Sequence, residues 1–124
     1  IPTNTLAPIN AIINPLKERP NRHLQELAAG TRYLLVADYA TPLIEQPIYN
    51  WVGADNTPLT ASANDIIQYN NNTHRWTVAF NSIEATSVEY VRNLTSGIQY
   101  RYADKMWVKS YEGFYEAGDY SIVI

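Results

Sequence analysis

The sequence predicts an all-β domain, a small antiparallel sandwich or barrel built from consecutive hairpins. Short segments alternate between apolar and polar residues with a period of two, which turns one face of each strand inward. Turn-forming residues separate these segments at close spacing. One aromatic pattern, an Ile-Gln-Tyr run followed by Trp, occurs twice: Ile67-Gln68-Tyr69 with Trp76, and Ile98-Gln99-Tyr100 with Trp107.

The composition fits one folded domain. The chain has 124 residues, of which 46% are hydrophobic and 17% charged, so it can bury a core. Ten tyrosines and three tryptophans suit half-buried sheet faces, because each ring has an apolar body and a polar tip. The net charge of −3, with scattered basic residues, predicts no nucleic-acid partner, and no apolar run is long enough to predict a membrane span. The lack of cysteine excludes disulfides and thiol catalysis.

Residues 1–20 predict an extended arm. Four prolines prevent a continuous helix in this segment: Pro2, Pro8, Pro15 and Pro20. We expect one helical turn near residues 9–13, and an arm that caps the domain or docks on a neighbour. Residues 21–124 then form a single β domain. Because the chain begins with Ile1 and shows no signal segment, we expect it to be a piece of a longer protein.

A short helix is predicted for residues 21–29. Asn21 can cap its start, and Gly30 follows at the place where a left-handed residue ends many helices. The next segment, residues 32–36, is an almost continuous apolar run rich in strand formers. Such a run is typical of a strand that is buried on both faces and therefore central.

Residues 39–63 form the least regular part of the chain, with prolines, glycine and asparagines throughout. Residues 48–52 could add a short strand within it. Long irregular segments in compact domains are often functional. Trp51 therefore has two interpretations, one as part of the core and one as an exposed binding residue.

The repeated aromatic pattern predicts two hairpins. Each should carry one cross-strand aromatic pair on its buried side: Tyr69 with Trp76, and Tyr100 with Trp107. In the first hairpin, Trp76, Val78 and Phe80 lie two residues apart, so we expect them to share one face. A strand over residues 87–94 precedes the second hairpin, and a last hairpin over residues 111–124 ends the chain.

No motif in the sequence points to catalysis, a metal ion or a cofactor. The two histidines, His23 and His74, lie in no pattern with Ser and Asp that would indicate a triad. Three carboxylate pairs could in principle serve glycosidase chemistry, but turn or surface positions explain each pair more simply: Glu84 with Glu89, Glu112 with Glu116, and Asp65 with Asp119. We therefore expect a protein that is not an enzyme.

Binding of a carbohydrate or receptor is the alternative function. Exposed aromatic rings can stack on sugars, and nearby Asn and Gln can bond to hydroxyl groups. The candidate ligand-binding residues are Trp51, Tyr49, Tyr111 and Tyr115. The partner would then be a host-surface glycan, and the protein would act outside the cell or at its surface.

Four stretches together resemble the small β modules in structural proteins of tailed bacteriophages and related gene-transfer particles. They are residues 29–36, Trp51-Val52-Gly53, residues 65–69 leading to Trp76, and Tyr100-Arg101-Tyr102 leading to Trp107. The similarity covers about residues 28–110. This sequence departs from the pattern by an insertion at residues 54–63, and by Tyr102 and Asp104-Lys105, which replace a Trp and the usual Asp-Gly turn.

The resemblance implies a non-catalytic component of a virion, in its tail, fibre or baseplate. Its partners would be other virion subunits, including further copies of the same chain. The family supplies no active residue that could be transferred to this sequence.

Overall fold

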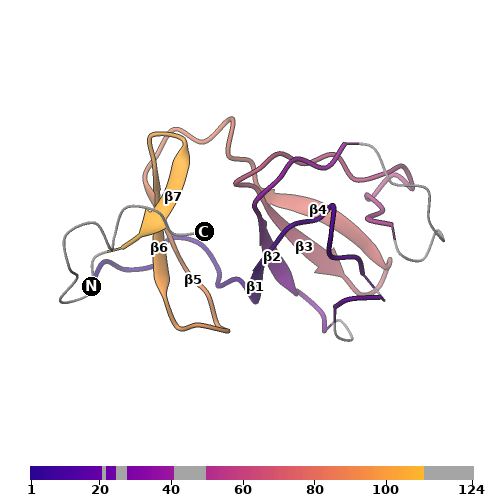
Figure 1. Ribbon diagram of the computed structural model, residues 1–124, viewed down its shortest axis with the longest axis horizontal. Helices are drawn as coiled ribbons and strands as arrows, with labels where there is room; N and C mark the ends of the chain where they lie inside the picture. The colour runs from indigo at the N-terminus through magenta and orange to yellow at the C-terminus, as the bar shows by residue number, and fades with distance from the viewer. Residues whose placement is uncertain (21, 25–27, 41–49, 111–124) are drawn as a thin grey trace.

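The computed structural model describes residues 1–20, 22–24, 28–40 and 50–110. In this part of the chain all regular structure is strand, arranged in two sheets (Figure 1). The first sheet, in the order β1-β2-β3-β4, contains β1 (Ala11–Ile13), β2 (Arg32–Leu35), β3 (Ile66–Asn70) and β4 (Arg75–Phe80). The second, in the order β5-β6-β7, contains β5 (Glu89–Arg92), β6 (Gln99–Ala103) and β7 (Met106–Lys109). The all-β prediction is therefore confirmed for the described residues.

The prediction of an antiparallel domain is wrong for the first sheet, which is mixed, whereas the second sheet is purely antiparallel. β1 pairs with β2 in parallel, with Ala11 opposite Tyr33. The other neighbouring strands of both sheets pair antiparallel. The helical turn expected near residues 9–13 is wrong, because Ala11–Ile13 forms the edge strand β1 instead.

The predicted helix at residues 21–29 lies partly outside the described residues, which omit 21 and 25–27. Its described residues are not helical, although the backbone N–H of His23 donates to the carbonyl of Arg19 at 3.1 Å. Gly30 has a φ of +77°, the left-handed conformation expected there. The last predicted hairpin, residues 111–124, also lies outside the described part.

β2 is the central strand that its apolar sequence predicted. It lies between β1 and β3, and Tyr33, Leu34 and Leu35 are all buried. Tyr33 and Leu35 belong to one core cluster, and Leu34 belongs to another. Since neighbouring side chains of a strand point to opposite faces, the two clusters lie on opposite faces of β2.

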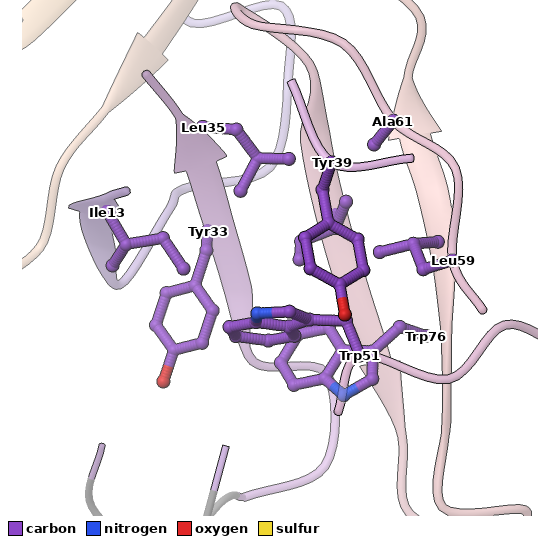
Figure 2. Packing of buried hydrophobic residues seen from close by; sticks show 9 residues of the cluster. Ile13, Tyr33, Leu35, Tyr39, Trp51, Leu59, Ala61 and Trp76 are labelled. Atoms are coloured by element: carbon purple, nitrogen blue, oxygen red, sulfur yellow. The ribbon is translucent and has the colours of Figure 1, made fainter. Parts of the chain in front are cut away.

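The first cluster, here called the tryptophan cluster, lies between the first sheet and the irregular segment (Figure 2). Its members are Ile13, Tyr33, Leu35, Tyr39, Trp51, Leu59, Ala61, Ile67 and Trp76. The ring centroids of Trp51 and Trp76 are 4.8 Å apart, at an interplanar angle of 75°. The Nε1–H of Trp51 donates to the carbonyl of Pro15 at 3.0 Å. Residues 39, 51, 59 and 61 of the irregular segment (residues 39–63) therefore pack on a face of the sheet.

The second cluster, here called the junction cluster, joins the two sheets. Its members are Ile9, Leu34, Ile66, Phe80, Val91, Tyr100, Tyr102 and Trp107. Phe80 reaches it because the register shifts between Ile66 and Ile67, so that Ile66 pairs with Phe80 and Ile67 with Val78. A bulge of this kind adds a residue to one strand and changes the face that follows. The prediction that Phe80 shares the face of Trp76 and Val78 is therefore wrong.

The first hairpin contains its predicted aromatic pair. Tyr69 stands opposite Trp76, and their ring centroids are 5.1 Å apart. Trp76 is buried, and the partly buried Tyr69 packs against the tryptophan cluster.

The second hairpin pairs a different tyrosine. Tyr102, rather than Tyr100, stands opposite Trp107. Asp104 and Lys105 form a two-residue turn with φ values of 52° and 64°, whereas residues 71–74 separate the strands of the first hairpin. The shorter loop shifts the pairing by two residues, so the predicted pair of Tyr100 and Trp107 is wrong, although both side chains are buried.

The N-terminal arm pairs with both sheets. The backbone N–H of Ile9 donates to the carbonyl of Arg92 in β5 at 2.9 Å, and that of Asn10 donates to the carbonyl of Arg32 in β2 at 2.8 Å. Ile9 is fully buried in the junction cluster. The arm therefore contributes to the core of the domain.

We predict that Trp51→Ala lowers the free energy of unfolding by about 3–5 kcal/mol, because it removes a fully buried ring and leaves a cavity. Ile83→Ala is the control, since Ile83 is 66% exposed and its loss should change stability by less than about 0.5 kcal/mol. Urea denaturation measures both values. Equal stabilities for the two variants would contradict the central place of Trp51.

Candidate interaction surface

Side-chain hydrogen bonds hold the β6–β7 hairpin against the segments just before β3 and just after β4. The Nε1–H of Trp107 donates to the carbonyl of Asn64 at 2.9 Å, and the hydroxyl of Tyr102 donates to the carbonyl of Ser82 at 2.8 Å. In return, the amide of Asn64 donates to the carbonyl of Lys105 at 3.3 Å. Both aromatic side chains thus combine apolar burial with a satisfied polar tip.

Asp65 joins the segments around Ser62 and Ser82, against which this hairpin packs. Its buried carboxylate accepts hydrogen bonds from the backbone N–H of Ser62 at 2.9 Å, and from the backbone N–H and hydroxyl of Ser82 at 2.8 and 2.7 Å. A buried carboxylate requires such donors to offset its desolvation. Asp65 therefore serves as a structural anchor, and Asp119, with which it was considered as a catalytic pair, lies outside the described residues.

Three exposed apolar side chains lie around the end of this hairpin and form the candidate site, here called the hairpin-tip surface. Ile83 is 66% exposed, Met106 53% and Val88 44%. Val88 also lines a hollow of about 460 Å³, whose lining residues 85–88 and 101–105 follow Ile83 and precede Met106 in the chain. The ammonium group of Lys105 donates to the carbonyl of Ile83 at 2.9 Å and ties the two sides together.

Charges of both signs accompany these apolar side chains. Arg101 and Asp104 line the hollow with Lys105, and the exposed Glu84 follows Ile83 in the chain. Apolar groups beside mixed polar groups are the usual composition of a protein–protein interface. The backing is rigid, because the hydrogen bonds of Trp107, Tyr102 and Asp65 hold both sides of the surface.

The structure places the predicted ligand-binding residue Trp51 in the core. Its ring is fully buried, and Trp76 and Trp107 are buried as well. The interpretation of Trp51 as an exposed stacking platform is therefore wrong, and the carbohydrate hypothesis loses its main support. The other candidates lie outside the described residues: Tyr49, Tyr111 and Tyr115.

Both histidines are exposed and have local partners. The Nδ1 of His23 accepts the backbone N–H of Arg19 at 3.0 Å, and the Nδ1 of His74 lies 2.8 Å from the hydroxyl of Tyr69. Within the described ranges, no three His, Asp or Glu residues group closely enough to hold a metal ion. The same part of the chain contains no helix with the length and apolar character needed to cross a membrane.

The sequence did not single out the hairpin-tip surface. Ile83 is an isolated apolar residue next to a turn and carries no periodic signal. Val88 belongs to the strand predicted over residues 87–94, but β5 begins only at Glu89 and Val88 is exposed. The exposure of Met106 could have been predicted, since alternation along β7 puts its side chain on the face opposite that of the buried Trp107. Its neighbours on the surface come from another part of the chain and become visible only in the fold.

Comparisons with known proteins assign no family to the chain. A scan against protein-family models finds no match, and searches of curated proteins and of solved structures find no significant match. The hairpin-tip surface and the sequence pattern are therefore the basis of the functional proposal below.

The burial of Tyr102 predicts that the stability of the fold depends on pH. Burial raises the pKa of Tyr102 above the ordinary value of 10.0, and the charge of Asp65 acts in the same direction, whereas the side-chain hydroxyl of Ser82 opposes the shift. Burial also raises the pKa of Tyr33 and Tyr100. Because each pKa is higher in the folded than in the unfolded state, the stabilisation is complete below pH 10 and is lost as the pH rises through the folded values.

We therefore expect the free energy of unfolding, measured by urea titration at a series of pH values, to fall above about pH 10. The free energy of unfolding of Tyr102→Phe should fall less steeply with rising pH than that of the wild type. At neutral pH the same variant should lose about 1 kcal/mol, because the buried carbonyl of Ser82 loses its donor. Identical pH profiles for the variant and the wild type would contradict the assigned environment of Tyr102.

Proposed function

We propose that this chain is a non-catalytic interaction module and a structural component of a tailed-phage virion. The observation that carries the proposal is the hairpin-tip surface, where Ile83, Val88 and Met106 are exposed and Val88 lines a hollow together with the end of the β6–β7 hairpin. Exposed apolar side chains that group around a hollow favour contact with another protein. The proposed partner is another virion subunit, and the proposed location is the virion.

Rigidity is the physical reason why this surface suits recognition. Lys105 is bonded to the carbonyl of Ile83, and the neighbouring Trp107 and Tyr102 are bonded to Asn64 and Ser82, which lie just before β3 and just after β4. A partner therefore pays little of the ordering cost that a flexible loop would require. An apolar side chain of the partner would enter the hollow, while its polar groups meet Arg101, Asp104 and Lys105 at the rim.

The sequence resemblance to phage structural modules supports the class of assembly. Among the residues that carry it, Tyr33, Trp51, Trp76 and Trp107 all lie in the two core clusters. The resemblance therefore concerns the packing of the domain, and the hairpin-tip surface supplies the proposed contact. No active residue takes part in either feature.

The proposal is tested in the phage or gene-transfer particle that encodes the chain. Particles assembled with Ile83→Asp/Met106→Asp in place of the wild-type chain should contain at least about tenfold less of it, because two carboxylates would be buried in an apolar contact. Leu94→Asp is the matched control, since Leu94 is 58% exposed and lies in the turn between β5 and β6, at the opposite end of β6 from Asp104 and Lys105. Quantitative immunoblots of purified particles measure incorporation.

Circular dichroism of the isolated variants checks that they fold. Wild-type incorporation of the double variant would contradict the role of the hairpin-tip surface. Complete absence of the wild-type chain from purified particles would contradict the assignment to a virion.

A further inference from the structure

The second sheet has an outer face, turned away from the junction cluster. On its central strand β6, Tyr100 and Tyr102 belong to that cluster. Because successive side chains of a strand alternate between its two faces, Arg101 and Ala103 point to the outer face. Ala103 stands opposite Met106 of the hairpin-tip surface. The outer face is therefore continuous with the hairpin-tip surface.

Arg101 lies in the middle of this outer face. It stands opposite Tyr90 on β5 and opposite Val108 on β7, and all three residues are partly buried. Among the described residues, no side chain forms a hydrogen bond or an ion pair with the guanidinium group of Arg101. A charged group that gives up part of its hydration without a counter-charge loses free energy, which a carboxylate can restore.

Positive charge predominates on the outer face. The outward-facing residues of the three strands include two arginines and no acidic residue: Tyr90, Arg92, Gln99, Arg101, Ala103, Met106 and Val108. In the neighbouring hollow, the charges of Asp104 and Lys105 offset each other. The chain as a whole carries a net charge of −3, so this face has the opposite sign to the rest of the protein. Such a face favours a partner surface with negative charge.

We propose that the partner of the hairpin-tip surface is an acidic segment of another virion protein, which presents an Asp or Glu side chain to Arg101 and an apolar side chain to Met106. This inference rests on the proposed function, because it names the chemistry of that same partner. A guanidinium group and a carboxylate can form two parallel hydrogen bonds, which fix their relative orientation. Tyr90 and Val108 flank the pair on both sides, so water and salt screen it less than a fully exposed pair.

Reversal of the charge at Arg101 tests the pairing in assembled particles. Arg101→Glu should lower incorporation of the chain at least about tenfold, because two carboxylates would then face each other. Arg101→Lys keeps the positive charge and should lower incorporation less. Lys17→Glu is the matched control, since Lys17 is exposed in the turn after β1 and its reversal changes the net charge equally. Quantitative immunoblots measure incorporation, and circular dichroism checks that each variant folds.

Carbodiimide coupling identifies the carboxylate and does not depend on the folding of Arg101→Glu. A water-soluble carbodiimide activates a carboxylate, and an adjacent amine then forms an amide bond with it. Arg101→Lys supplies that amine. Mass spectrometry of treated Arg101→Lys particles should find the introduced lysine coupled to an Asp or Glu of another virion protein, at least about tenfold more than the exposed Lys17.

Coupling to another virion protein would support the inference. Coupling to a carboxylate of this chain itself would overturn it, because the chain would then supply the counter-charge of Arg101. Coupling no greater than at Lys17, or wild-type incorporation of Arg101→Glu, would overturn it as well.

The variant Ile83→Asp/Met106→Asp separates this inference from the proposed function. If that variant loses incorporation while Arg101→Glu keeps it, the hairpin-tip contact stands and the acidic partner is excluded. If that variant is incorporated like the wild type, the proposed function fails first.

Discussion

The fold depends on the burial of β2 on both of its faces. Tyr33 and Leu35 support the tryptophan cluster, and Leu34 supports the junction cluster. Neither sheet is large, so each face needs a cover that lies far away in the sequence. The irregular segment covers one face and the second sheet covers the other. Any change that loosens Arg32–Leu35 should therefore be felt in both clusters.

The sequence predicted those features of the fold that follow from local periodicity. The apolar run at β2 indicated a central strand, and the alternation in β3 and β4 indicated the pair of Tyr69 and Trp76. Two irregularities of register were not predictable in this way. The bulge that turns Phe80 to the junction cluster depends on pairing with β3, and the two-residue turn at Asp104 sets the partner of Trp107. Neither changes the apolar–polar pattern.

Tertiary contacts also explain why the candidate site could not be predicted from the sequence. Trp51 seemed available because its neighbours are turn formers, yet the ring has a cluster to enter and a carbonyl to bond. Ile83 and Lys105 lie far apart in the chain, and their hydrogen bond forms where Tyr102 and Trp107 join the two sheets. The arm likewise looked like a separate extension, although Ile9 completes the junction cluster. Exposure, which decides between core and surface, is a property of the whole fold.

The central claim is that the two clusters form one cooperative unit across β2, and fluorine NMR of 5-fluorotryptophan protein tests it most directly. Trp51 and Trp76 report on the tryptophan cluster, and Trp107 reports on the junction cluster. In a urea titration, all three native resonances should disappear at one midpoint, and Leu34→Ala should lower that midpoint equally for each. Loss of the Trp107 resonance at a lower urea concentration than the other two would contradict the claim.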